Sequence, residues 1–200
     1  MLKSSRSRLP QNYSRPGAFA VPITRAYLLA AGRGKRAGGP KAWLSSDGVS
    51  LLERQLRYLS EIVPANAISV SIQAGWEERC RALLPGGRFV PVDPDASAFS
   101  SFRALLDDRS LRGWSSLHHV DMPVWEKSLF AVPENTDAHA LIPVFGDRGG
   151  HPVLLNENLG DALMALDPIT GRLDHFLAAQ KTLRRTTPHA VAIENWNEGP

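Results

Sequence analysis

A glycine-rich basic loop follows a buried apolar strand near the start of the chain. Residues 28–44 read LLAAGRGKRAGGPKAWL and contain four glycines and four basic residues. Glycines let backbone amides approach an anion closely, while Arg and Lys supply positive charge for phosphate oxygens. Ligands of open α/β sheets bind outside the carboxyl ends of the strands, where this loop would lie. The segment therefore predicts a phosphate-binding loop at the edge of an α/β sheet.

The rest of the chain alternates between strand-like and helix-like apolar patterns. Strands are expected at residues 25–31, 67–73, 88–92, 116–121, 141–145, 152–155 and 189–193, and helices at 50–62, 76–84, 97–108, 159–166 and 173–180. In the first helix, Ser50 and Glu53 form a capping box. This alternation predicts one three-layer α/β domain with a mainly parallel, Rossmann-like sheet and helices on both faces.

The net charge of +3 comes largely from the N-terminal end of the chain. Residues 1–24 contain no acidic residue and four basic ones, Lys3, Arg6, Arg8 and Arg15, so the remainder is close to neutral. A general nucleic-acid binder needs a basic folded face, so we expect no nucleic-acid partner. We divide the chain into a basic, flexible N-terminal arm, residues 1–24, and a folded domain, residues 25–200.

Cysteine content and hydropathy bear on the compartment. The single cysteine, Cys80, excludes an internal disulfide framework and a cysteine-based structural zinc site. No apolar run reaches the roughly 18 residues that a membrane-spanning helix needs, and no secretory signal precedes the first strand. We therefore expect a cytoplasmic protein without a membrane partner.

Two phosphate-loop motifs fit residues 28–44 incompletely. A mononucleotide P-loop would run from Gly34 to Gly39, but Pro40 precedes Lys41, and Ala42 replaces the hydroxyl residue that holds magnesium. A dinucleotide-binding fingerprint would use Gly32 and Gly34 followed by Ala37. It lacks the acidic residue expected at the end of the second strand, where Gln73 stands.

The same run resembles the signature L-A-[AG]-G-x-[SG]-x-R-M-G-x-x-K-x-L-L of nucleotidyltransferases with the molybdenum-cofactor guanylyl- and cytidylyltransferase fold. Gly32, Gly34, Arg36, Gly38 and Lys41 fall on its fixed positions, while alanine replaces the methionine. The resemblance implies the fold of the nucleotide-diphospho-sugar transferases and covers residues 25–198.

Later segments resemble further elements of this family in the same order. They are FSSFRAL at residues 99–105, with Ser100 and Ser101, Asp121 in HHVDMP, His151 and Pro152 in GGHPVLL, and Asn195 and Asn197 in IENWNEG. In the family these elements line the nucleotide pocket, hold magnesium, shape the acceptor side and close the site, respectively.

The resemblance implies transfer of a nucleoside monophosphate from CTP or GTP to a phosphorylated acceptor, with Mg²⁺ as cofactor and pyrophosphate released. Arg36, Lys41 and Asp121 would be catalytic. The nucleotide would be bound by Leu29, Ala30, Ala31, Gly32, Arg33, Gly34, Lys41, Ser100 and Ser101, the metal by Asp121, Asn195 and Asn197, and the acceptor side would include His151 and Pro152. Positioning and electrostatics dominate such chemistry, so no protein nucleophile is required.

Three questions stay open at this point. The Ala30-Ala31 pair and the SSFRA stretch favour cytidine-type members, whereas the two asparagines near the C-terminus favour guanosine-type ones. The acceptor could be molybdopterin or a sugar phosphate, and a molybdoenzyme maturation partner is conceivable. A nucleotide-binding protein without turnover and a dinucleotide-dependent oxidoreductase are the alternative functions.

Overall fold

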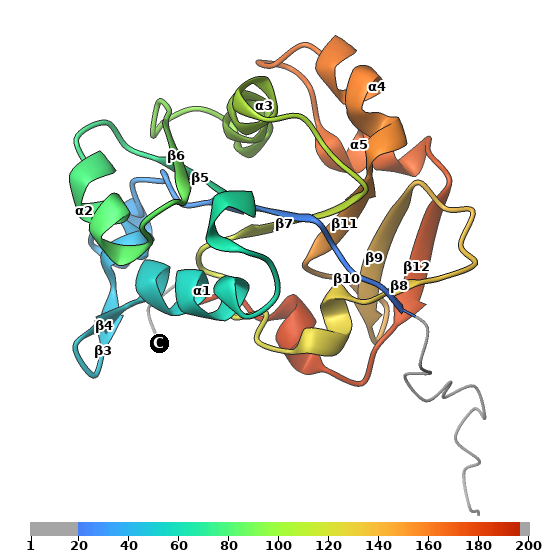
Figure 1. Ribbon diagram of the computed structural model, residues 1–200, viewed down its shortest axis with the longest axis horizontal. Helices are drawn as coiled ribbons and strands as arrows, with labels where there is room; N and C mark the ends of the chain where they lie inside the picture. Colours follow the sequence, from blue (N-terminus) through green and yellow to red (C-terminus); the bar gives the residue numbers. More distant parts are fainter. Residues whose placement is uncertain (1–19, 197–200) are drawn as a thin grey trace, which may run out of the picture.

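A mixed eight-stranded sheet forms the centre of the computed structural model, which describes residues 20–196 except for the side chain of Arg36 (Figure 1). Its strands are β2 (Arg25–Leu29), β5 (Ile68–Ile72), β6 (Arg88–Pro91), β7 (Trp114–His119), β9 (Ala140–Phe145), β10 (Arg148–Gly149), β11 (Val153–Asn156) and β12 (Thr182–Thr186). Two small two-stranded sheets pair β1 (Ala20–Val21) with β8 (Val132–Pro133), and β3 (Ser45–Ser46) with β4 (Val49–Ser50).

The strand order is β10-β9-β11-β7-β2-β5-β6, with β12 on the other side of β9. Strands β6, β5, β2 and β7 are parallel, as are β9 and β12, whereas β11 runs antiparallel to β7 and β9. Leu29 lies opposite Ser71 on β5 and His119 on β7, so the carboxyl ends of these strands share one edge. The predicted α/β sheet, parallel over its functional half, is confirmed.

Helices cover both faces of the sheet (Figure 1). The α-helices are α1 (Leu51–Ser60), α2 (Glu77–Leu83), α3 (Ala98–Asp108), α4 (Gly160–Ala165) and α5 (Leu173–Ala178). Short 3₁₀ helices are η1 (Lys35–Ala37), η2 (Lys41–Trp43), η3 (Ala65–Ala67), η4 (Lys127–Phe130), η5 (Glu157–Leu159) and η6 (Ala190–Ile193). One apolar core lies beneath α3, α4 and α5, and the other beneath α1, α2, η4 and η6. The three-layer arrangement follows directly.

Helix α1 forms because its sequence supplies both a cap and an apolar stripe. Ser50 accepts a hydrogen bond from the Glu53 amide at 3.3 Å, which satisfies one of the unpaired donors of the first turn. The leucines of the inner face, Leu51, Leu52, Leu56 and Leu59, are all buried. The helix is thereby fixed against the face of the sheet that carries the larger core.

The prediction of a last strand at residues 189–193 is wrong. Residues Ala190–Ile193 form the 3₁₀ helix η6, and the last strand is β12, which the apolar pattern did not predict. Short apolar runs do not distinguish a strand from a helical turn by periodicity alone. Strand β12 has the sequence TLRRT and lies at the edge of the sheet beside β9, where polar residues remain in contact with solvent.

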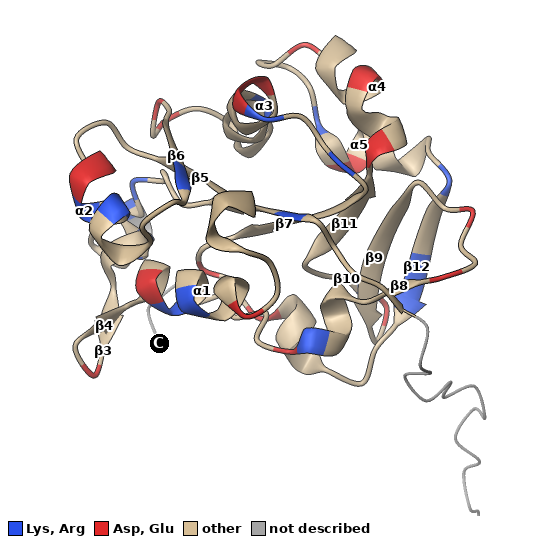
Figure 2. Ribbon diagram, in the orientation of Figure 1, with Lys and Arg blue, Asp and Glu red and all other residues tan. Residues whose placement is uncertain are grey.

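The predicted N-terminal arm, residues 1–24, is described only from Ala20, where β1 pairs with β8. Acidic and basic residues stand close to one another on α1, α2 and α3 (Figure 2). Among the described residues, no helix is both long and apolar enough to cross a membrane.

Candidate nucleotide-binding site

A cavity of about 430 Å³ opens at the carboxyl ends of the parallel strands β2, β5, β6 and β7. It is lined by residues 29–35, 93–96 and 119–121 together with Lys41, Ser71, Ala98 and Ser101. Parallel strands leave unpaired backbone groups and loop side chains at this edge, which is the usual ligand site of such sheets. The glycine-rich loop thus lies where the sequence predicts it.

The glycine-rich loop is folded around Gly34. Its φ of +60° lies in the left-handed region, and its carbonyl accepts hydrogen bonds from the amides of Ala37 at 2.8 Å and Gly39 at 3.2 Å. A Cβ at this position would lie 1.8 Å from the carbonyl oxygen of Gly39. Only glycine fits here, because both the backbone angle and the close approach exclude a side chain.

Three backbone donors of this loop belong to residues that line the cavity. The amides of Gly32, Arg33 and Gly34 donate to no other described residue, although all three residues line the cavity. Successive N–H groups directed into a concave surface form an anion-binding site. The loop can therefore hold phosphate oxygens through its main chain.

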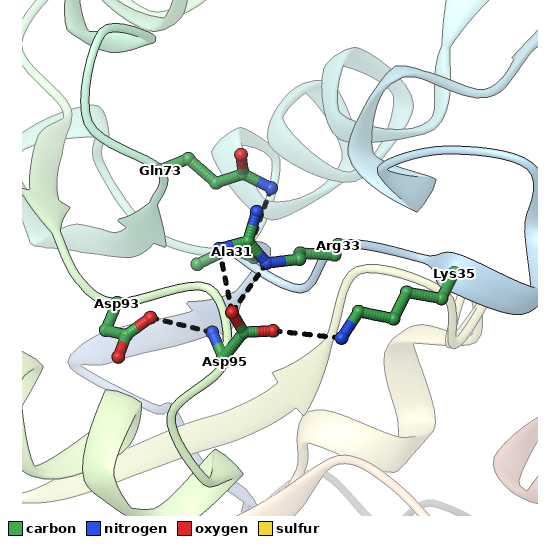
Figure 3. Close-up of polar contacts among 6 residues, drawn as sticks. All are labelled: Ala31, Arg33, Lys35, Gln73, Asp93 and Asp95. Atoms are coloured by element: carbon green, nitrogen blue, oxygen red, sulfur yellow. Dashed lines mark hydrogen bonds and ion pairs between the residues drawn. The ribbon is translucent and has the colours of Figure 1, made fainter.

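The first residues of the loop are held by the neighbouring strand β5. The Ala30 amide donates to the Ser71 carbonyl at 3.1 Å, and the Gln73 side-chain amide donates to the Ala31 carbonyl at 3.0 Å (Figure 3). Gln73 stands where a dinucleotide-binding fold would place its acidic residue, and it binds the protein's own backbone instead. These contacts fix the direction in which the loop leaves the sheet.

Lys41 and Asp121 meet at the cavity, although 80 positions separate them in the chain. The Lys41 Nζ lies 2.5 Å from Asp121 Oδ2, and the two side chains are only 17% and 14% exposed. Lys41 begins η2, whose Trp43 packs edge-to-face on Trp76 at 5.2 Å between ring centroids. The lysine is thus held on a packed turn and directed at the carboxylate that follows β7.

A second charged cluster lies at the mouth of the cavity. Arg33 contacts the Asp95 carboxylate at 2.7 Å, and Lys35 reaches it at 3.4 Å (Figure 3). The hydrogen bond from Arg33 is the main reason that the pKa of Asp95 lies below its ordinary value. The Asp93 carboxylate accepts a hydrogen bond from the Asp95 amide at 2.9 Å, and this bond shapes the turn between β6 and α3. These contacts join the glycine-rich loop to the loop that connects β6 to α3.

A histidine pair borders the same cavity. His119 lines it, and its ring packs edge-to-face on the ring of His151 at 5.6 Å between centroids. Burial lowers the pKa of His119, and burial also lowers the pKa of His151 to about 4. Both imidazoles are therefore neutral at neutral pH and can act as hydrogen-bonding groups rather than as charges.

Most of the residues expected at the nucleotide lie together. Residues 29–34 and Lys41 line the cavity with Ser101, whereas Ser100, also in the first turn of α3, does not. Arg36 belongs to η1, immediately after the cavity-lining residues, and its side chain lies outside the described part.

His151, Pro152 and Asn195, expected on the acceptor side and at the closing motif, do not line this cavity. The peptide bond between His151 and Pro152 is cis, and the His151 ring approaches His119. The Trp196 amide donates to the Asp121 carbonyl at 2.8 Å, which brings the exposed Asn195 near the end of β7. Asn197 lies outside the described residues.

Sequence reasoning missed five polar residues of the cavity, namely Lys35, Ser71, Asp93, Asp95 and His119. The sequence DPD, residues 93–95, directly follows the expected strand at 88–92 and precedes the expected helix at 97–108. Polar residues at the carboxyl end of a parallel strand are candidates for ligand contact. The position of Asp93 and Asp95 after this strand could therefore have identified both as candidate site residues.

The donor set fits a divalent cation held jointly by protein and substrate. Asp121 supplies one carboxylate, and among residues 20–196 no cluster of three or more His, Cys, Asp or Glu side chains could hold a metal ion. Magnesium commonly uses one or two carboxylates together with water and substrate phosphates. The site matches this pattern and not an all-protein metal cage.

The loop geometry does not match the two phosphate motifs considered from sequence. Both motifs require the glycine-rich turn to lead directly into a helix whose N-terminus faces the phosphates. Here two 3₁₀ turns and the β3–β4 hairpin intervene before α1. The loop thus offers an anion its own amides and lysine rather than a helix N-terminus.

Comparisons with known proteins agree with this geometry. The family model of the MobA-like NTP transferase domain matches residues 26–185. No curated protein matches the chain by sequence.

Three solved structures share the fold. Rv0371c from Mycobacterium tuberculosis H37Rv in complex with manganese has a TM-score of 0.63 at 18% identity, covering 90% of this chain and 96% of its own. Molybdopterin-guanine dinucleotide biosynthesis protein A from Archaeoglobus fulgidus gives 0.57 at 16% identity, with coverages of 82% and 83%. The inositol-1-phosphate CTP transferase from T. maritima gives 0.62 at 15% identity, with coverages of 84% and 87%.

Proposed function

We propose, from the premise that this chain belongs to the MobA-like NTP transferase domain family, that it transfers CMP or GMP from CTP or GTP to a phosphorylated small molecule. The family makes the chain a nucleotidyltransferase. The proposal adds the donor, the class of acceptor and Mg²⁺ as the metal. Two structural neighbours carry guanine and CTP in their names, and both donors are therefore retained.

The ion pair between Lys41 and Asp121 carries this proposal. It places one cation and one carboxylate beside the free amides of the glycine-rich loop, all lining a single cavity. A triphosphate needs positive charge for its oxygens and a carboxylate to hold its divalent cation.

The chain's own groups would act by binding and charge neutralisation. The amides of residues 31–34 would hold the triphosphate, while Arg36 and Lys41 would neutralise its β- and γ-phosphates. Leu29 and Ala30 would line the floor of the site, with Ser100 and Ser101 at the start of α3. An acceptor phosphate oxygen forms a bond to the α-phosphorus as the bond to the β-phosphate oxygen breaks, and pyrophosphate leaves.

Asp121 would hold Mg²⁺, with Asn195 and Asn197 as neutral oxygen ligands. The position of Trp196, whose amide binds the Asp121 carbonyl, supports a role for the adjacent Asn195. When bound, the cation stabilises negative charge that develops on the transferring phosphoryl group and on pyrophosphate. With Asp121 holding the cation, Lys41 would be available to the phosphates.

The acceptor would approach from the side of His151 and Pro152. His151 contacts His119, which lines the cavity with Asp121, and this contact supports an acceptor side next to the proposed nucleotide site. Molybdopterin and sugar phosphates are the acceptor candidates, and with molybdopterin the product would pass to a molybdoenzyme maturation partner.

The experiment is a pyrophosphate-release assay with CTP, GTP, ATP and UTP, each with MgCl₂ and either molybdopterin or a panel of sugar phosphates. We expect release with CTP or GTP that requires both acceptor and metal. Tight binding of a triphosphate without release under any combination would contradict the proposal and leave a nucleotide-binding protein. Thermal stabilisation identifies the preferred base, because a ligand at 100 times its Kd adds about 2.7 kcal/mol.

A further inference from the structure

A buried glutamine interrupts the leucine face of α1. Gln55 is completely buried, and its neighbours on the inner face are Leu51, Leu52, Leu56 and Leu59. A polar side chain in an apolar layer is unfavourable unless its hydrogen bonds are satisfied. The contacts of Gln55 therefore indicate what this residue does.

Gln55 binds the backbone on both sides of Asp121. Its Nε2 donates to the Val120 carbonyl at 3.2 Å and to the Met122 carbonyl at 2.5 Å. These carbonyls lie where the chain has left β7, so no neighbouring strand supplies them with a ladder partner. The side-chain amide of Gln55 thus binds the residues immediately before and after Asp121, which pairs with Lys41.

The remaining contacts of this segment complete its restraint. The Val120 amide donates to the Leu29 carbonyl at 2.9 Å, and the Trp196 amide donates to the Asp121 carbonyl at 2.8 Å. Three consecutive carbonyls, at residues 120–122, are therefore each held by a donor from elsewhere in the fold. The direction of the Asp121 side chain is fixed through its backbone.

Gln55 lowers the folding stability relative to an apolar residue at the same position. Gln55 Oε1 is buried and has no hydrogen-bond partner among the described residues. An unpaired buried acceptor is destabilising, and conflicts of this kind concentrate at functional sites. Gln55 thus satisfies two carbonyls of the Asp121 segment while its own acceptor stays unpaired, which singles out its position beside Asp121.

We propose that Gln55 is a positioning residue for Asp121: it sets the carboxylate at the distance and angle needed to receive a divalent cation bound to phosphate. This inference rests on the proposed function, because it assumes that Asp121 binds the metal. Gln55 does not line the cavity and would act only through the backbone of the Asp121 segment. Outer contacts that orient a metal ligand commonly change metal affinity 10- to 100-fold when they are removed.

The test is Mn²⁺ binding to the full chain, measured by electron paramagnetic resonance in the presence of inorganic pyrophosphate. Gln55→Met keeps the length of the side chain but removes both donors. We expect the Mn²⁺ Kd to rise about 10- to 100-fold. Pyrophosphate binding in EDTA should stay within about twofold of wild type, because the hydrogen bonds of Gln55 go to the Val120 and Met122 carbonyls and not to the glycine-rich loop.

The matched control is Leu59→Ala, one turn further along the same buried face of α1. It destabilises the core beneath the helix and leaves the hydrogen bonds from Gln55 to the Val120 and Met122 carbonyls in place, so its Mn²⁺ Kd should equal that of wild type. An equal loss of Mn²⁺ affinity in Leu59→Ala, or none in Gln55→Met, would overturn the positioning role. Asp121→Asn separates the two claims, since unchanged Mn²⁺ binding there overturns the metal assignment in the proposed function and the role of Gln55 with it.

Discussion

Replacing Gly34 with alanine should disable catalysis far more than it unfolds the protein. The new Cβ would lie 1.8 Å from the Gly39 carbonyl oxygen, whereas real Cβ contacts stay beyond 3.0 Å. The loop must therefore shift by roughly 1 Å, and a displacement of that size at a reacting group can cost about 100-fold in rate. We expect kcat/KM to fall about 100-fold, equivalent to about 2.7 kcal/mol of transition-state stabilisation.

The control for this prediction is Gly38→Ala in the same loop. Gly38 also has a positive φ, of +76°, but a Cβ there meets nothing within 4 Å. Both variants should lose about 1–2 kcal/mol of stability from the left-handed backbone alone. Thermal unfolding measures the shared loss, and steady-state pyrophosphate release measures the difference. Equal kcat/KM values for the two variants would refute the claim that the Gly34 to Gly39 contact shapes the phosphate site.

Three further predictions concern charge, pH and capping. Asp95→Asn releases Arg33 and Lys35 for the triphosphate and should lower KM about two- to fivefold at low salt, an effect that disappears at high salt; an unchanged KM at low salt would contradict it. The pKa of His118 is lowered to about 3 by burial, below its unfolded value of 6.5, so stability should fall as the pH drops from about 6.5 towards 3. His118→Leu should flatten this dependence in a Tm series, and an unchanged slope would exclude His118 as its source. Ser50→Ala removes the N-cap of α1 and should cost about 1 kcal/mol in denaturant unfolding while kcat stays the same.

The sequence predicts those parts of the site that depend on local pattern. The glycine-rich loop is local, and its lysine and the strand-end Asp121 converge because parallel strands align their carboxyl ends. The apolar runs likewise predict every strand of the parallel half of the sheet. Strand β12 was not predicted because its sequence, TLRRT, lacks an alternation of apolar and polar residues. It pairs with β9 along one edge only.

The contacts that sequence reasoning misses join residues far apart in the chain. Arg33 meets Asp95 across 62 positions, and Gln55 meets Val120 across 65. No periodicity or motif links such residues, because their proximity arises only when the sheet and its helices assemble. Gln55 is an example. Its spacing within α1 indicates only that it lies on the inner face of the helix, and nothing in the sequence indicates that it binds the carbonyls beside Asp121.

The central claim is that Lys41 and Asp121 together serve nucleotidyl transfer. Single-turnover pyrophosphate release from the preferred triphosphate, measured for wild type, Lys41→Ala and Asp121→Asn at matched folded fraction, tests it most directly. Removing one stabilising charge should slow release on the order of 100-fold or more in each variant. Release within a few-fold of wild type in either variant would contradict the account.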